Sequence, residues 1–273
     1  MKYKLLVLDV DGTLVDQKGN INRCDTEAVK KAVGAGVTVA LSTGRVVQAC
    51  DCVLKELCLD GYHIFFDGAL ISNPHTGDVI YSKPIQKKKV LQAVEYSRET
   101  STYLELYDHS SFYAERSNWT DEIHDLFFNV SIMIDDLAVI GKTKEILKME
   151  TIARHPEEYE QAKELIKEFE GLLRFSTASS PAFPGVNFYN ILHPEVSKGN
   201  ALEVLCDYLG ITLEETIAIG DGLNDLSLIK TAGLGVAMGN AYPEVKAVAD
   251  VVTDSVDEGG ISKVVSDYIL NGI

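Results

Sequence analysis

Two aspartates, Asp9 and Asp11, stand two residues apart directly after the apolar run 5–8, in the segment Asp-Val-Asp-Gly-Thr. Like charges held close together in a poorly solvated site disfavour each other's ionisation. Such a pair suits a bound divalent cation, or a site in which one carboxyl group works as an acid. Gly12 lets the chain turn sharply above the strand. A hairpin turn is the alternative interpretation of Asp-Gly, so the rest of the chain must decide.

A second candidate segment, Ser42-Thr43-Gly44-Arg45, follows the apolar stretch 37–41. Hydroxyl groups and a glycine at a strand-to-helix turn present side-chain and backbone donors to an anion. Serine and threonine are also common helix N-caps, and a cap is the alternative interpretation here.

Two later segments supply a cation and two more carboxylates. Lys198 opens an expected helix, where its charge is unfavourable against the helix dipole unless an anion lies nearby. Asp221 and Asp225 lie four residues apart after the expected strand 216–219, with Asn224 beside them. Turn formation or helix capping is the alternative for these two aspartates.

The carboxyl ends of parallel strands lie at one edge of an open sheet, where ligands bind in such folds. Asp9, Asp11, Thr43 and Asp221 each follow an expected strand, so we expect them to meet at that edge. Acidic oxygens suit Mg²⁺, and a hydroxyl group with the ammonium group of Lys198 suits a phosphoryl group. One shared site explains these segments better than four unrelated turns.

Short apolar runs alternate with amphipathic segments, which predicts an α/β fold: a Rossmann-like parallel sheet in a three-layer α/β/α core. The expected strands are 4–8, 37–41, 64–66, 186–191, 216–219, 235–237 and 251–253. The expected helices are 25–35, 46–57, 198–209, 223–232, 243–249 and 260–270. Glycine and Asn-Pro breakers in 67–82 predict a small antiparallel excursion.

The middle of the chain changes character and predicts an inserted α+β cap domain over residues 85–185. Helical patterns at 86–99 and 156–169 mix there with alternating β-type stretches. The core would then comprise residues 1–84 and 186–273, with proline-containing linkers at the two junctions.

Composition excludes several classes of partner. Among 273 residues, 46% are hydrophobic and 24% charged, as in ordinary globular proteins. A net charge of −16 disfavours nucleic acid and anionic membrane surfaces, which need a basic footprint. No apolar run reaches membrane-spanning length and the N-terminus carries no signal sequence, so we expect a cytoplasmic protein. The five cysteines lack the paired spacing of zinc sites and are interpreted as reduced thiols.

The four segments together resemble the haloacid dehalogenase-like superfamily, and within it the Cof-type sugar-phosphatase branch with a type IIB cap. The matching motifs are DxDGT at 9–13, TGR at 43–45, lysine-glycine at 198 and GDxxND at 220–225. The interval between the second and third motifs has the length expected of the inserted cap. The resemblance implies a Mg²⁺-dependent phosphatase that acts on small phosphorylated metabolites such as sugar phosphates.

The resemblance also implies roles for individual residues. Asp9 would be the nucleophile that becomes an aspartyl phosphate, and Asp11 would be the general acid and base. Mg²⁺ would be held by Asp9, the backbone carbonyl of Asp11, and Asp221. Asp225 would brace the metal or a neighbouring lysine.

The implied phosphate-binding groups are Val10, Thr43, Gly44, Lys198 and Asn224. Ser42 and Arg45 would support them, and Ser42 is an alternative to Thr43 as the hydroxyl group that faces the phosphate. Cap residues that could line a substrate site are His109, Tyr113, Trp119, His124, Phe183 and Asn187, although each is more readily explained as ordinary core or surface.

Two other functions fit the same segments. A phosphomutase similar to phosphomannomutase would share the core and would need arginines in the cap; those present are Arg98, Arg116, Arg154 and Arg174, in no recognisable motif. A non-catalytic protein that binds a phosphorylated metabolite is the alternative of another class. Carbon–halogen cleavage is disfavoured because it leaves no alkoxide for Asp11 to protonate.

Overall fold

The computed structural model describes residues 2–127, 131–179 and 183–271. Its contacts divide the chain into two compact units. The first unit comprises Met1–Arg45, Cys50–Tyr81 and Ser197–Ile273, and the second comprises Val46–Ala49 and Ser82–Val196. In the described residues, no helix combines the length and the apolar character needed to cross a membrane.

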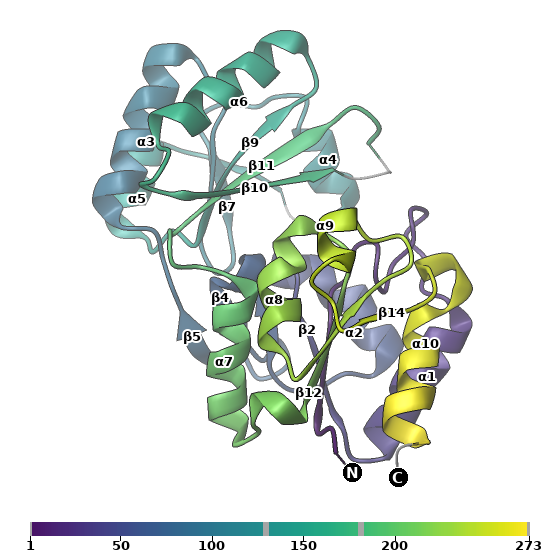
Figure 1. The fold of residues 1–273 in the computed structure, drawn as a ribbon. Coiled ribbons are helices and arrows are strands. Elements are labelled where there is room, and N and C mark those ends of the chain that lie inside the picture. Colours follow the sequence, from purple (N-terminus) through teal and green to yellow (C-terminus); the bar gives the residue numbers. More distant parts are fainter. Residues whose placement is uncertain (1, 128–130, 180–182, 272–273) are drawn as a thin grey trace. The chain divides into compact units, whose positions relative to one another are not determined.

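The first unit is built on a parallel sheet (Figure 1). Within the described residues its strands run in the order β14 (Val251–Val252), β13 (Leu234–Ala237), β12 (Thr216–Gly220), β1 (Leu5–Leu8) and β2 (Thr38–Leu41). All four residues of β1 are buried, because a central parallel strand is covered on both faces. The predicted parallel α/β core is therefore confirmed.

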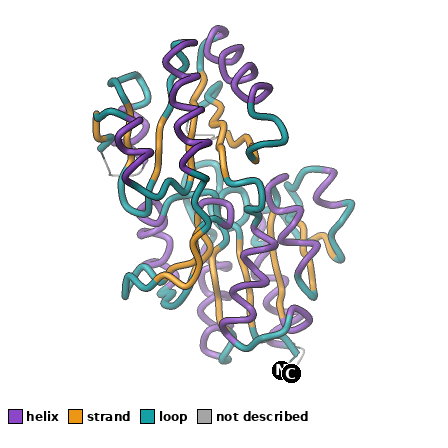
Figure 2. The backbone as a smooth tube through the Cα atoms, turned by 90° about the vertical axis from the view of Figure 1, so that its left-hand side faces the viewer, coloured by secondary structure: helices purple, strands orange, loops and turns teal. Residues whose placement is uncertain are grey.

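Helices cover both faces of this sheet, as Figure 2 shows. The helices of the first unit are α1 (Arg23–Gly34), α2 (Asp51–Leu57), α7 (Lys198–Leu209), α8 (Leu226–Thr231), α9 (Pro243–Lys246) and α10 (Gly260–Val264). The last of these continues as a π-helical segment, Val265–Leu270. Leu5 and Val7 of β1 pack with Leu202, Leu205 and Leu228 of α7 and α8 in one apolar cluster. Burial of such side chains contributes about 1.5–3 kcal/mol each.

A small second sheet joins β3 (His63–Phe65), β4 (Leu70–Ser72) and β5 (Val79–Ser82). The antiparallel pairing of β3 with β4 confirms the predicted excursion. The strand expected at 64–66 belongs to this sheet and not to the parallel one, to which it is joined by a bridge between Ser42 and Ile64.

The described part of the second unit contains a mixed sheet in the order β10 (Arg174–Ser179), β11 (Asn187–Leu192), β9 (Lys148–Ala153), β6 (Glu105–Tyr107), β7 (Phe112–Ala114) and β8 (Met133–Ile134). Its helices are α3 (Lys87–Thr100), α4 (Asp121–Phe127), α5 (Leu137–Thr143) and α6 (Pro156–Glu168). Leu106, Met149 and Ile191 join the apolar cluster that also holds residues of α3, α5 and α6. The α+β character expected of the middle segment is present.

One predicted strand lies elsewhere than expected. The stretch 186–191 was assigned to the parallel core, but β11 pairs antiparallel with β9 and β10 in the second unit. The strand reads Asn-Phe-Tyr-Asn-Ile-Leu and its last four residues are buried, so the sequence alone resembles a buried core strand. The linker expected at 181–185 falls partly outside the described residues, and its described part belongs to the connection from β10 to β11.

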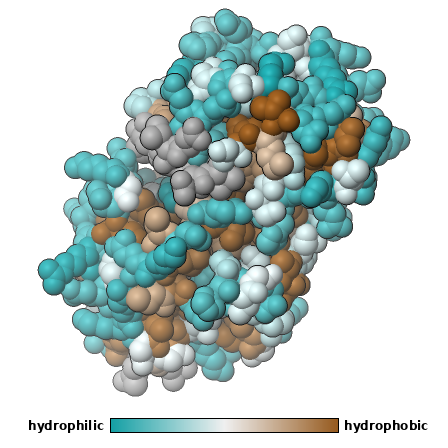
Figure 3. Space-filling model, turned by 180° about the vertical axis from the view of Figure 1, so that it is seen from behind, coloured by the Kyte–Doolittle hydropathy of each residue, from teal (hydrophilic) through white to brown (hydrophobic). Residues whose placement is uncertain are grey.

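The molecular face in Figure 3 is mainly hydrophilic, with hydrophobic residues exposed in small groups. Scattered exposed hydrophobic residues are normal for folded proteins.

A buried carboxyl group joins the first and last helical segments of the first unit. Asp25 of α1 is fully buried, and its Oδ1 accepts a hydrogen bond from the backbone N–H of Ser262 in α10 at 2.6 Å. Burial raises the pKa of Asp25 to about 6, although backbone N–H groups of Ser262 and Ile261 oppose the shift. The protonated acid is therefore the form that the fold favours.

We expect the free energy of unfolding to fall, relative to Asp25→Asn, as the pH rises through about 6. A raised pKa contributes stability that is complete below the unfolded-state value near 4 and is lost above the folded-state value. Asparagine is neutral at every pH and keeps an acceptor for Ser262. Urea unfolding from pH 4.5 to 7.5 should show a relative loss of roughly 2 kcal/mol. Glu27→Gln, an exposed change on the same helix, is the control; parallel pH profiles for wild type and Asp25→Asn would contradict this account.

Candidate active site

Three of the predicted segments meet at the carboxyl edge of the parallel sheet. Asp9 follows β1, Ser42 and Thr43 follow β2, and Asp221 follows β12, and β1 lies between β2 and β12 in the sheet. The N–H group of Asp9 donates to the carbonyl of Ile219 at 3.0 Å, which continues the ladder into the site. The sheet order therefore brings together residues that are more than 200 positions apart.

Lys198 lies at the centre of this group. Its Nζ donates to Oδ1 of Asp9 and to Oδ1 of Asp225, both at 2.6 Å. Its side chain is fully buried, as is that of Asp225. Burial alone lowers the pKa of Lys198, but attraction to Asp225 and Asp9 outweighs burial and leaves that pKa above its usual range. A permanent cation is thus held between two carboxylates.

The start of α7 fixes Lys198 in this place. Ser197 caps the helix by accepting from the N–H of Asn200 at 3.0 Å. Gly199 lies so close to α8 that a Cβ atom there would be 2.7 Å from the carbonyl oxygen of Ser227. A glycine at position 199 therefore allows the close approach that brings Lys198 to the sheet edge.

Asp225 is occupied by protein hydrogen bonds on both oxygens. Its Oδ1 accepts from Lys198, and its Oδ2 accepts from the backbone N–H groups of Asp221 at 3.0 Å and Gly222 at 2.9 Å. These bonds shape the turn that carries Asp221. The geometry favours a supporting role for Asp225, as the motif suggested.

Asp221 is held by Thr13, which ends the DxDGT motif but was given no role there, and by Asn240, which the sequence analysis did not identify. Thr13 Oγ1 donates to Oδ1 of Asp221 at 2.9 Å, and Asn240 Nδ2 lies 3.3 Å from Oδ2. Asn240 also donates to the carbonyl of Gly12 at 2.8 Å. Gly12 has a φ of +83°, and a Cβ atom there would lie 2.3 Å from Asp221 Oδ2. The glycine is required both for the turn and for the space that Asp221 fills.

Oxygen atoms of Asp9, Asp221 and Asp225 all lie within 4.8 Å of one another. Burial and the neighbouring Asp225 raise the pKa of Asp9 well above its usual value and raise that of Asp221 to about 6. A bound cation would relieve this repulsion, and clustered carboxylate oxygens are donors that suit Mg²⁺. Since Asp225 is already engaged, Asp9 and Asp221 are the side chains that fit a metal.

The side chain of Asp11 pairs with Arg45 and not with Lys198. Its side chain is 62% exposed and is held by Arg45, whose Nε donates to Oδ2 at 2.9 Å and whose Nη2 donates to Oδ1 at 2.6 Å. Burial lowers the pKa of Arg45, but Asp11 more than compensates and the pKa is raised. This bidentate ion pair fixes the orientation of the Asp11 carboxylate.

The predicted anion-binding residues lie around the acidic cluster. Thr43 Oγ1 accepts from the N–H of Arg45 at 3.1 Å, so its hydroxyl proton remains available for an anion. Ser42 Oγ is buried and has no hydrogen-bond partner in the described part of the chain. The carbonyl of Val10 accepts from the turn that follows β1. Asn224 donates to Asp67, a residue that the sequence analysis did not use.

The cap candidates have partners within the second unit. Tyr113 donates to Asp108, Trp119 donates to Glu158, and the His124 ring lies 3.0 Å from Glu105. Phe183 packs in a local apolar cluster, and Asn187 Nδ2 lies 3.5 Å from the hydroxyl group of Tyr189. His109 is exposed. More polar side chains that the sequence analysis missed are buried on this sheet, among them Lys148 and Glu150. Their isolated positions in the sequence gave no motif that could reveal them.

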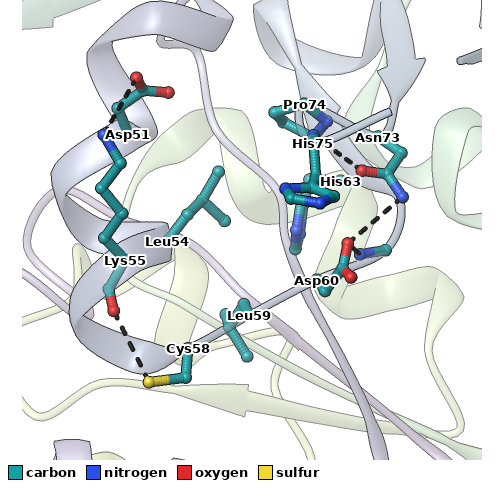
Figure 4. Close-up of a pocket in the computed structure, with 11 residues that line it drawn as sticks. Asp51, Leu54, Lys55, Cys58, Leu59, Asp60, His63, Asn73, Pro74 and His75 are labelled. Atoms are coloured by element: carbon teal, nitrogen blue, oxygen red, sulfur yellow. Dashed lines mark hydrogen bonds and ion pairs between the residues drawn. The ribbon is translucent and has the colours of Figure 1, made fainter. Parts of the chain in front are cut away.

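A separate cavity of about 410 Å³ lies beside α2, near the small sheet (Figure 4). Its lining includes Asp51, Lys55, Cys58, Asp60 and His63, and it includes none of the predicted site residues. His63 Nδ1 accepts from a backbone N–H, and burial lowers the pKa of His63 to about 4, so the ring is neutral. This cavity is distinct from the acidic cluster.

We expect Lys198→Met to lower the free energy of unfolding by about 3–5 kcal/mol in the presence of chelator. The change leaves Asp9 and Asp225 buried without their cation, although methionine fills a similar volume. Urea denaturation measures the loss. Lys230→Met, an exposed change on α8, should alter stability by less than about 0.5 kcal/mol. Equal unfolding midpoints for Lys198→Met and wild type would show that the buried carboxylates do not depend on this lysine.

Sequence similarity to known proteins identifies the family of this chain. The family model described as haloacid dehalogenase-like hydrolase matches residues 6–265. The Bacillus subtilis protein YxeH is 31% identical, with 98% of this chain and 99% of that protein aligned. The 5-amino-6-(5-phospho-D-ribitylamino)uracil phosphatase YcsE of Bacillus subtilis is 30% identical, over 98% of this chain and 96% of its own length.

A solved structure agrees with these relatives. A haloacid dehalogenase-like hydrolase from Bacteroides thetaiotaomicron has a TM-score of 0.83 and 29% identity, covering 97% of this chain and 98% of its own. The resemblance found from the motifs is confirmed at the level of the family. The chain belongs to the haloacid dehalogenase-like hydrolases, and relatives such as YcsE are named as phosphatases.

Proposed function

We propose that the protein is a Mg²⁺-dependent phosphatase of small phosphorylated metabolites that works through an aspartyl phosphate on Asp9. The observation that carries the proposal is the buried arrangement of Lys198 between Asp9 and Asp225, beside Asp221 at the sheet edge. Carboxylates for a metal and donors for a phosphate lie together there. Phosphoryl transfer depends on such positioning and on neutralising charge.

Two displacements at phosphorus would complete the reaction. An oxygen of Asp9 attacks the phosphorus atom, the bond to the ester oxygen breaks, and Asp11 gives a proton to the departing alkoxide. Asp11, now a carboxylate, takes a proton from water, whose oxygen attacks the phosphorus of the aspartyl phosphate. As that bond forms, the bond between phosphorus and the Asp9 oxygen breaks. The reaction ends with the alcohol, inorganic phosphate, the free carboxylate of Asp9 and a reprotonated Asp11. Both carboxylate oxygens of Asp11 accept hydrogen bonds from Arg45, so at least one of these bonds must break before Asp11 can transfer a proton.

Asp9, Asp221 and the backbone carbonyl of Asp11 would hold Mg²⁺, which supplies positive charge to the phosphoryl oxygens. Asp225 would hold the turn of Asp221 and the ammonium group of Lys198. The phosphate would be bound by donors already near this edge: Val10, Thr43, Gly44, Lys198 and Asn224.

We further propose that the second unit, which includes the expected cap residues 85–185, acts as the cap that selects the substrate. The name of the relative YcsE gives a phosphorylated ribityl compound as its substrate. This supports small phosphorylated sugars or polyols as the substrate class. The cysteines are free thiols, which suits a reducing cytoplasm.

A phosphomutase is the second candidate on this core. Three of the cap arginines are already engaged within the second unit. Arg98 pairs with Glu115 and Asp136, Arg116 donates to the carbonyl of Ser101, and Arg154 lies over the ring of Trp119. They are less suited to hold a second phosphate. Product analysis separates the reactions, because a mutase yields an isomerised sugar phosphate, whereas a binding protein yields no product.

We expect wild type to release inorganic phosphate from a panel of phosphomonoesters with Mg²⁺ and not with chelator. Asp9→Asn should reduce release by roughly 10³-fold or more, because the amide cannot act as the nucleophile. A phosphate assay on purified proteins measures both effects. Asp207→Asn, an exposed change on α7, should retain wild-type release. Substantial turnover by pure Asp9→Asn would remove Asp9 from the nucleophile's role.

We expect Asp11→Asn to affect esters according to their leaving groups. Loss of a general acid typically costs 10²–10⁴-fold when the leaving group needs a proton. An alkyl phosphate should therefore lose much more kcat than p-nitrophenyl phosphate, whose leaving group departs as a stable anion. Steady-state kinetics on both substrates measures the difference. An equal loss on both would mean that Asp11 does not protonate the leaving group.

A further inference from the structure

Asp67 occupies a turn that reaches into the candidate phosphate site. The turn Phe66–Gly68 follows β3, and its residues have φ values of +52°, +53° and +105°. Positive φ is uncommon for residues other than glycine, and asparagine and aspartate are among those that tolerate it best. The N–H of Asp67 donates to the carbonyl of Thr43 at 2.9 Å. The turn is thus tied to one of the proposed phosphate-binding residues.

The same turn packs against the start of α7. A Cβ atom on Gly68 would lie 2.3 Å from the carbonyl oxygen of Ser197, so no larger residue fits there. Ser197 caps the helix that begins with Lys198. Asp67 is therefore placed by contacts with two separate parts of the site.

The side chain of Asp67 is 5% exposed and faces three of the proposed phosphate-binding residues. Its Oδ1 accepts from Nδ2 of Asn224 at 2.9 Å. A Cβ atom on Gly44 would be 3.0 Å from the same oxygen. The charge of Asp67 also acts on Lys198, after those of Asp225 and Asp9.

A carboxylate in this position opposes the binding of phosphate in two ways. Its negative charge repels the phosphate dianion in a buried site, where screening is weak. It also accepts a hydrogen bond from Asn224, whose amide is one of the proposed phosphate donors. The amide oxygen of Asn224 lies on the side of Gly222, where a Cβ atom would be 2.5 Å from it. Asn224 is thus held with its NH₂ group toward Asp67.

We propose that Asp67 keeps the affinity of the site for inorganic phosphate low, so that the product leaves after each turnover. This inference rests on the proposed phosphatase function. Lys198, the proposed metal and the backbone donors all attract phosphate. Asp67 opposes that attraction beside the carboxylates of Asp9 and Asp225, which Lys198 already pairs. It affects product affinity and takes no part in bond breaking.

The test compares wild type, Asp67→Asn and Asp67→Gly in the presence of Mg²⁺. Asparagine and glycine both accept a positive φ, so the turn is kept. Asp67→Asn removes only the charge, because its amide oxygen can still accept from Asn224. Asp67→Gly removes the charge and also frees the Asn224 amide. The inhibition constant of inorganic phosphate is measured in the phosphatase assay, and calorimetric titration with phosphate measures its affinity directly.

We expect the inhibition constant to fall about tenfold in Asp67→Asn and at least as far in Asp67→Gly. Asp207→Asn should leave it unchanged. If one variant fails to fold, the other still carries the same expected direction. An unchanged or higher constant in a folded variant overturns the inference while leaving the phosphatase proposal intact. If wild type releases no phosphate from any ester, that proposal fails separately, and the calorimetric comparison still decides the effect of Asp67.

Discussion

The buried contact of Lys198 with Asp9 and Asp225 is the interaction on which the site depends. Removing an ammonium group and two carboxylates from water is costly, and the cost is offset only when charges and hydrogen bonds match closely. Asp225 meets this condition through its further bonds to the turn of Asp221. Asp9 meets it less well, because its pKa stays raised by burial and by its acidic neighbours. That residual repulsion is what a bound cation would relieve.

The parallel sheet determines where this contact can form. Neighbouring parallel strands end at the same edge of the sheet. Asp9, Thr43 and Asp221 follow β1, β2 and β12, so they meet there although they are far apart in the sequence. Lys198 is not positioned by a strand of the parallel sheet, because the strand that precedes it, β11, belongs to the mixed sheet of the second unit. The start of α7 supplies its position, through the Ser197 cap and the close approach at Gly199.

Several supporting residues became visible only in three dimensions. Thr13 and Asn240 hold Asp221, Arg45 holds Asp11, and Asp67 holds Asn224. The sequence analysis identified Arg45 because it belongs to the TGR motif, but it did not predict that Arg45 pairs with Asp11. Thr13 ends the DxDGT motif, but its contact with Asp221 could not be read from it. The contacts of Asn240 and Asp67 likewise join residues far apart in the chain and leave no local spacing to detect. The buried polar side chains of the second unit, such as Lys148 and Glu150, escaped notice for the same reason.

The sequence by itself determined the α/β class, most of the helices, the acidic and phosphate-binding motifs and the family. These depend on local information: apolar runs, helical periodicity, and residue types at fixed spacing after a strand. Tertiary structure decided what depends on pairing over long distances. It placed β11 in the mixed sheet of the second unit and moved β3 out of the parallel sheet. It also showed that Asp225 pairs with Lys198, which is one of the two roles that the resemblance had implied. Strand partners and buried charge pairs are chosen by the energy of the whole fold, which no single segment encodes.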